Sequence, residues 1–227
     1  MIGGLSWESS ALYYKMINEG VRDQLGGSNA AKILISSVNF AEITDLRESG
    51  GWDAVAEVLG REAVNLEKSG ADCLIMGANT VHIIAEQVEE KIHIPLIHIV
   101  DTVGQAAQKM KVKRIALTGT IYTMEGTFFQ DRLKEIFQIE TIVPGKEERA
   151  EVHRIIFEEL TLGIIKEESK KYLNDLYETM KKSSVEAAVL GCTELGLLTG
   201  ENDLTYPVID SAKTHAAAAV AYALADQ

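Results

Sequence analysis

The chain alternates short apolar runs with longer segments whose apolar positions recur every three or four residues. The short runs are typical of buried parallel strands and the longer segments of amphipathic helices. The expected strands are Ile33–Val38, Cys73–Met76, Leu96–Ile99, Arg114–Leu117, Ile139–Ile142, Ala187–Leu190 and Val208–Ile209. The expected helices are Ser9–Gln24, Trp52–Ser69, Ile83–Lys91, Val103–Met110, Thr127–Ile136, Glu147–Leu160, Glu168–Lys182 and Ser211–Ala225. This alternation predicts an α/β fold with mainly parallel sheets.

Composition and charge narrow the classes of partner. The chain has 227 residues, 46% of them hydrophobic, with only three prolines, so we expect an ordered globular protein of one large or two small domains. A formal charge of −12 argues against nucleic acid or an anionic membrane surface as a partner. The longest strongly apolar stretch, Ala216–Ala225, is too short to span a bilayer.

The N-terminal residues and the cysteines indicate the cellular compartment. Only Met1 and Ile2 precede Gly3, with no basic or long apolar region, so we expect no signal peptide and a cytoplasmic location. The two cysteines, Cys73 and Cys192, lack CxxC or Cys/His ligand spacing, which argues for a reducing compartment and against a zinc site.

A weak internal repeat links two turns. Thr80 and Cys192 are 112 residues apart (192 − 80), and so are Pro95 and Pro207 (207 − 95). In each copy a buried strand ends in a turn of small residues, presents a nucleophile-type side chain, and is followed by a strand that proline introduces. Two similar lobes facing each other would place Thr80 and Cys192 on opposite walls of one cleft. Chance recurrence of a strand-turn-helix unit is the alternative.

Eight segments, read in order, make the chain resemble the aspartate/glutamate racemase family. They are Gly3–Ser9, Phe40–Ile43, Gly77–His82, Pro95–Asp101, Gly119–Met124, Ile156–Leu160, Lys166–Lys170 and Gly191–Leu195. They run nearly end to end, and their joint occurrence makes the resemblance specific.

The resemblance implies two similar Rossmann-like α/β domains, related by a pseudo-twofold axis, with the active site in the cleft between them. We expect one domain to contain residues 1–98 and 208–227 and the other residues 99–207. It further implies a homodimer and a reaction without metal, pyridoxal phosphate or other cofactor, in which two acid/base groups act on opposite faces of Cα. A full strand normally precedes the Gly3-Gly4 loop in this family. Either the native chain begins earlier or the first strand is a stub.

Cys192 and Thr80 are the expected catalytic residues. A thiol has a reference pKa of about 8.5, which falls at a helix N-terminus or beside a cation. The Gly-Cys-Thr-Glu turn after an apolar strand predicts such a helix start for Cys192. Thr80 stands where the commonest family pattern has a second cysteine. Its hydroxyl is a poor base, so it either relays a proton, directly or through water, or only shapes the pocket and caps the following helix. Cys73, inside a strand, is interpreted as core.

The resemblance also indicates substrate-binding residues. Lys166 follows the family's position for gripping a carboxylate, although its local context also fits a solvated helix face. Arg47, in the loop expected after Phe40–Ile43, suits a side-chain carboxylate, although a surface arginine is the stronger alternative. His82 and Glu194 either tune the neighbouring catalytic residue or orient the substrate, or they only begin helices. The remaining candidates are Ser6, Asn79, Val81, Thr120, Thr123, Thr193 and Glu194.

These residues predict a racemase that converts L-aspartate or L-glutamate to the D form. Cys192 would take the proton from the L face, as the C-terminal cysteine does in the family, and Thr80 or water would serve the other. Two alternatives stay open. One is a decarboxylase of the arylmalonate type, whose members have a single cysteine at the C-terminal position. The other is a non-catalytic protein that binds acidic amino acids.

Overall fold

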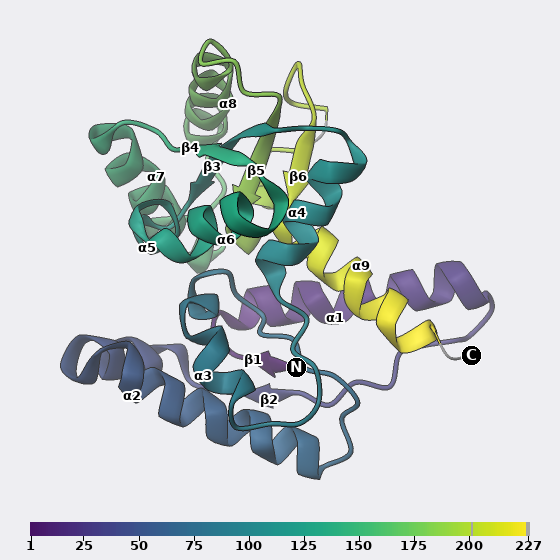
Figure 1. Ribbon diagram of the computed structural model, residues 1–227. Coiled ribbons are helices and arrows are strands. Elements are labelled where there is room, and N and C mark those ends of the chain that lie inside the picture. The colour runs from purple at the N-terminus through teal and green to yellow at the C-terminus, as the bar shows by residue number, and fades with distance from the viewer. Residues whose placement is uncertain (201, 226–227) are drawn as a thin grey trace. The chain divides into compact units, whose positions relative to one another are not determined.

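The computed structural model describes residues 1–200 and 202–225 and divides the chain into two compact units. The first unit contains Met1–His98 and the C-terminal residues from His215, and the second contains Ile99–Thr214 (Figure 1). The sequence had suggested that residues 208–214 belong with the first unit. They lie in the second because the strand at Val208–Asp210 pairs with its sheet.

The second unit is built on a four-stranded parallel sheet. Its strands lie in the order β4 (Glu140–Ile142), β3 (Arg114–Gly119), β5 (Ala187–Gly191) and β6 (Val208–Asp210) (Figure 1). All pairs are parallel, and the register places Gly119 opposite Gly191. The predicted strands of this region are therefore confirmed to within two residues, as is the prediction of a mainly parallel α/β fold.

Helices cover both faces of this sheet because successive residues of its strands point to opposite sides. Ala187 and Val189 of β5 join the core with α4 (Ile99–Lys109) and α6 (Thr127–Phe137). Ala188 and Leu190 join the core with α7 (Lys146–Glu158) and α8 (Glu167–Lys181). Three short helices follow strands or helices in this unit: α5 (Ile121–Glu125), η2 (Leu160–Leu162) and η3 (Thr193–Leu197).

The first unit has much shorter strands. Among its described residues, only β1 (Ile2–Gly3) and β2 (Ser36–Ser37) pair as strands, in parallel. Two isolated parallel bridges extend this arrangement. One pairs Ile2 with Met76, and the other pairs Leu74 with Leu96. The predicted strands at Ile33–Val38, Cys73–Met76 and Leu96–Ile99 thus lie in extended segments, but they were predicted too long. Ile99 already begins α4.

The described part of the first unit contains five helices. They are α1 (Trp7–Leu25), α2 (Phe40–Lys68), η1 (Thr80–Ile84), α3 (Ala85–Glu89) and most of α9 (Ser211–Leu224). Helix α2 begins twelve residues before the predicted start at Trp52. The Asn39 side chain caps this earlier start by accepting a hydrogen bond from the Ala41 amide. Within the helix, the regular backbone is interrupted at Gly51, whose φ is 70°. No helix among the described residues has the length and apolar character needed to cross a bilayer.

The two units share one backbone pairing. The Leu74 amide donates to the Pro95 carbonyl at 2.9 Å, and the Ala188 amide donates to the Pro207 carbonyl at 2.8 Å. In both units the strand before the key turn therefore lies beside the segment that proline introduces. The predicted strand after Pro207 is present as β6, whereas Leu96 after Pro95 makes only an isolated bridge.

Candidate active site

Cys192 directly follows β5 and precedes η3. Its side chain is buried, and its thiol donates a hydrogen bond to Oε2 of Glu194 at 3.0 Å. The Thr193 hydroxyl donates to the same oxygen at 2.6 Å. Burial, followed by the charge and hydrogen bond of the Glu194 carboxylate, raises the pKa of the Cys192 thiol well above its usual value. The expected lowering of this pKa at a helix start was wrong, because these effects outweigh the amides of a single 3-10 turn.

The turns after β3 and β5 lie side by side. Because Gly119 pairs with Gly191, Thr120 and Cys192 are the next residues on two adjacent parallel strands. Thr120 caps α5 by accepting a bond from the Thr123 amide at 3.3 Å. A Cβ on Gly191 would lie 3.3 Å from Cγ2 of Thr123 and 2.7 Å from the Thr118 carbonyl, so glycine permits this close packing.

Lys166 is anchored in an ion-pair network that the sequence analysis missed. It stands at the N-cap position of α8, and its Nζ lies 3.2 Å from Oε1 of Glu159. Arg154 also donates to Oε1, at 2.8 Å, and the Ser169 hydroxyl donates to Oε2 at 2.6 Å. Although burial alone raises it, the pKa of Glu159 is lowered to about 2 by the bonds from Ser169, Arg154 and Lys166. Glu159 and Ser169 lie in two of the family-like segments, Ile156–Leu160 and Lys166–Lys170, and this was the only sequence signal that pointed to them.

This network lies next to the Cys192 turn. The η2 helix, directly after Glu159, packs against η3. Leu160 of η2 and Leu195 of η3 belong to the same core as Cys192. The second unit therefore brings Thr120, Thr123, Thr193 and Glu194 to the turn that carries the thiol, and the network that holds Lys166 adjoins the same core through η2.

The first unit brings together its own two predicted turns. The Ser9 hydroxyl donates to the Gly77 carbonyl at 2.7 Å, which ties the start of α1 to the turn before Thr80. Ser6 caps α1 by accepting a bond from the Ser9 amide at 3.2 Å. Gly4 has a φ of 75°, and a Cβ there would lie 2.0 Å from the Val38 carbonyl. Only glycine fits this turn.

Thr80 is the first residue of η1 and is half-buried. The helix cap is Asn79, which makes no side-chain capping bond, so the alternative in which Thr80 caps the helix was wrong. Val81 is buried in the core of the first unit. Any contact of Val81 with a substrate would therefore use its backbone.

His82 belongs to a buried histidine cluster in the first unit. Its ring centroid lies 4.8 Å from that of His98 and 5.5 Å from that of His215. His215 bonds the Tyr13 hydroxyl at 2.8 Å and the Ile97 carbonyl at 2.7 Å. Burial lowers the pKa of His215 to about 4, and burial with the two neighbouring rings lowers the pKa of His82 well below its usual value. The rings of His82 and His215 are therefore neutral at pH 7.

Arg47 lies in helix α2, so its predicted place in a loop was wrong. The expected loop is helical because the Asn39 cap starts the helix ahead of it. Arg47 stands one turn after Ile43, on the helix face that packs toward the core containing Val81. Its side chain is only 15% exposed and lies 3.4 Å from Glu48. This burial is unlike that of an ordinary surface arginine.

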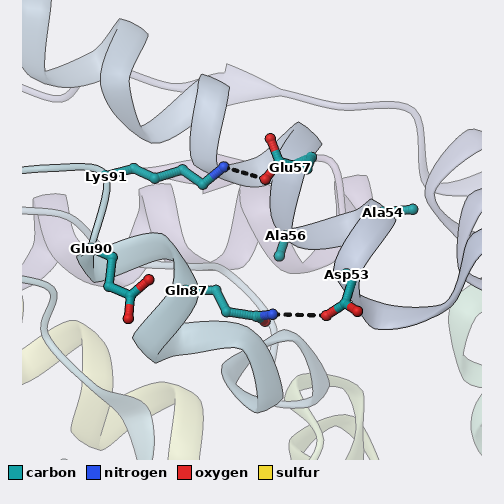
Figure 2. A pocket seen from close by; sticks show the side chains of 7 residues that line it. All are labelled: Asp53, Ala54, Ala56, Glu57, Gln87, Glu90 and Lys91. Carbon is teal, nitrogen blue, oxygen red and sulfur yellow. Dashed lines mark hydrogen bonds and ion pairs between the residues drawn. The ribbon is translucent and has the colours of Figure 1, made fainter.

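A pocket of about 410 Å³ lies between α2 and α3, and it contains none of the predicted site residues (Figure 2). Three carboxylates line it, from Asp53, Glu57 and Glu90. Lys91 pairs with Glu57 at 2.6 Å, and Gln87 donates to Asp53 at 2.8 Å. The excess of negative charge makes this pocket unsuited to an acidic amino acid.

Comparison with known proteins identifies the class. A family model described as Asp/Glu/hydantoin racemase matches residues 2–219. The chain belongs to this family and is an isomerase of the amino acid racemase class. A candidate Asp/Glu racemase from Yersinia pestis has a similar crystal structure, with 41% identity, coverage of 98% of this chain and 97% of that one, and a TM-score of 0.92.

Two further relatives differ in their described substrates. The crystal structure of an aspartate racemase homologue from Pyrococcus horikoshii OT3 is 34% identical, covers 98% of this chain and 96% of that one, and has a TM-score of 0.87. The broad specificity amino-acid racemase RacX of Bacillus subtilis is 26% identical over 73% of this chain and 70% of its own length. The family is therefore clear, whereas the relatives' names differ in substrate range.

Proposed function

We propose that this racemase converts L-aspartate or L-glutamate to the D enantiomer, with Cys192 as the base on the L face and Thr80 or water on the opposite face. The observation that carries the proposal is the hydrogen bond from the Cys192 thiol to the Glu194 carboxylate. It supplies the thiol with a proton acceptor inside a buried site. A cysteine that served only as core would have no use for a buried carboxylate partner.

The chemistry follows from this bond. The thiol proton passes to Glu194, which leaves a thiolate at Cys192. The thiolate removes the Cα proton from the L face, so that the C–H electron pair stays on Cα and the substrate becomes a carbanion. Thr80 or a water molecule then gives a proton to the opposite face of Cα. The Cys192 thiol now carries the former Cα proton, Glu194 releases the former thiol proton to solvent, Thr80 regains its proton from solvent, and the enzyme is restored.

Two cations and several small donors suit the substrate's carboxylates. Lys166 and Arg47 supply positive charge, and Ser6, Asn79, Thr120, Thr123 and Thr193 supply neutral donors close to the two catalytic residues in their own units. An acidic amino acid carries two carboxylates and so needs this combination. We further propose that the reaction needs no pyridoxal phosphate or metal, and that the enzyme acts as a cytoplasmic homodimer.

The test is Cα–H exchange in D₂O, followed by proton NMR, with L-aspartate and L-glutamate as substrates. Cys192→Ser should abolish both exchange and inversion. The matched control is Cys73→Ser, because Cys73 is the other cysteine of the chain and has no role in the proposed chemistry. It should retain both activities. Retained exchange in Cys192→Ser would contradict the proposal.

A further inference from the structure

Glu159 is a buried carboxylate to which the proposed chemistry gives no role. It follows α7, and both of its oxygens are occupied: Oε1 by Arg154 and Lys166, and Oε2 by Ser169. A buried carboxylate is costly unless each oxygen receives a donor. The network therefore fixes the carboxylate, and with it the ammonium group of Lys166.

The charges explain why Lys166 stays in place. The Arg154 guanidinium serves three carboxylates, because besides Glu159 it donates to both oxygens of Glu151, at 2.9 Å and 2.7 Å, and lies 3.6 Å from Glu158. One positive charge thus faces three negative charges, and Lys166 supplies a second positive charge. Movement of Lys166 into solvent would leave the three carboxylates with a single cation between them.

Lys166 still has donors to offer. An ammonium group carries three hydrogens, and Glu159 is the one partner of Lys166 among the described residues. Its side chain is 48% exposed, so the other hydrogens can meet a ligand. An anion that arrives there finds a cation already held in one position and needs to order little of the side chain.

The backbone of Glu159 fixes the approach to Lys166 as well. Its carbonyl accepts the amides of Leu162 at 3.0 Å and Ile164 at 2.9 Å. The segment between Glu159 and Lys166 is therefore folded back on the residue whose side chain binds Lys166. One residue sets both the path of the chain and the position of the ammonium group.

We propose that Glu159 is the positioning residue for Lys166: it holds the ammonium group in the orientation that receives a substrate carboxylate. This inference rests on the proposed function, in which Lys166 binds that carboxylate. Glu159 touches no reacting atom. Its effect appears in the KM of acidic substrates, and it acts only through Lys166.

A double-mutant cycle of Glu159→Gln and Lys166→Met, measured on L-aspartate and L-glutamate, tests the inference. Lys166→Met should raise KM about tenfold or more, which is the loss of one charge-assisted bond. Glu159→Gln should raise KM about fivefold, with kcat within about twofold of the parent. In the Lys166→Met background Glu159→Gln should change KM by less than about twofold, because its effect passes through the lysine.

Each contrary outcome has a distinct meaning. An unchanged KM in Lys166→Met would contradict the role of Lys166 in the proposed function. A raised KM in Lys166→Met with an unchanged or lowered KM in Glu159→Gln would overturn this inference alone. Fully additive effects would also overturn it, since they would mean that Glu159 supports the fold and not the lysine.

One control separates positioning from a general effect on helix α8. Asp203→Asn removes the 2.8 Å partner of Lys170, which lies on the same helix as the Lys166 cap, and should leave KM unchanged. A rise in KM with Asp203→Asn equal to that of Glu159→Gln would overturn the inference.

A measurement on the unmutated protein covers the case in which Glu159→Gln does not fold. The side-chain ammonium of Lys166 should give a nitrogen-detected NMR signal protected from fast hydrogen exchange at pH 7. Lys15, whose side chain is 68% exposed, provides the unprotected reference. Exchange of Lys166 as fast as that of Lys15 would show that Glu159 does not hold it.

Discussion

The thiol of Cys192 donates its hydrogen bond to Glu194, only two residues further along the chain. The bond has two opposite effects. Burial, together with the negative charge, raises the pKa of the thiol, so that the resting residue is protonated, and the same carboxylate accepts the hydrogen bond of that proton. Under the proposed mechanism Cys192 therefore becomes a base by passing its proton to Glu194.

Glu194→Gln separates these effects. The loss of the negative charge should lower the pKa of Cys192, measured by the ultraviolet absorbance of the thiolate during a pH titration. The loss of the acceptor should lower kcat/KM about 100-fold, at the lower end of the range for general base catalysis. A variant with a lower thiol pKa and full activity would show that Glu194 does not take the proton.

Thr80→Cys tests the second face of Cα. A thiol ionises far more readily than an aliphatic hydroxyl. If transfer at this face is slow, the variant should racemise both enantiomers faster, as measured by circular dichroism of the amino acid. Thr80→Ser, which keeps a hydroxyl, is the matched control and should remain near the parent rate. A Thr80→Cys variant no faster than the parent would contradict the assignment of Thr80 as the weak partner.

Arg47→Ala tests the second cation. Loss of a charge-assisted bond to a carboxylate should raise KM for L-aspartate and L-glutamate by about tenfold or more. Arg61, exposed on the same helix α2, is the control, and Arg61→Ala should leave KM unchanged. Equal KM values in Arg47→Ala and Arg61→Ala would show that Arg47 does not bind the substrate.

The buried histidines predict loss of stability in mild acid. His215 is neutral when folded, with a pKa of about 4, whereas the unfolded chain binds its proton near pH 6.5. As pH falls below about 6.5 the unfolded state is therefore favoured, by about 2 kcal/mol from this residue between pH 7 and pH 5. His82, whose pKa is also lowered, adds to the effect.

Urea unfolding at pH 7 and pH 5 measures this difference. The parent should lose more stability than His215→Gln between the two pH values, although the variant is less stable at both. His93, whose side chain is 94% exposed, is the control, and His93→Gln should show the pH dependence of the parent. An identical pH dependence in His215→Gln would contradict the prediction. Carboxylates with lowered pKa values, such as Glu159, contribute only below about pH 4.5.

Hydrophobic patterning predicted the second unit better than the first. The strands β3, β4, β5 and β6 are continuous apolar runs between periodic helices, so periodicity located them. In the first unit the extended segments pair through only one or two residues, and apolar runs do not show where pairing stops. The Gly50-Gly51 pair also hid the first half of α2, because glycine usually ends a helix.

Motifs located candidate residues but not their electrostatics. The turn around Cys192 was identified from sequence, yet the direction of its pKa shift depends on burial and on the direction in which Glu194 points. The Glu159 network joins residues on α7, the following turn and α8, which sequence spacing alone does not place together. Side-chain partners of this kind need tertiary structure.

Proton exchange in D₂O tests the unequal pair of catalytic groups most directly. Enantiomers have equal free energies in water, so kcat/KM must be the same for L and D, and net rates cannot reveal the asymmetry. Exchange can, because a base that removes a proton from one face can return a deuteron to the same face. We predict that the L substrate incorporates deuterium faster than it inverts, whereas the D substrate exchanges little before it inverts. Equal ratios of exchange to inversion for the two enantiomers would show that protons are transferred equally well at both faces of Cα. That result would contradict the assignment of Cys192 and Thr80 as an unequal pair.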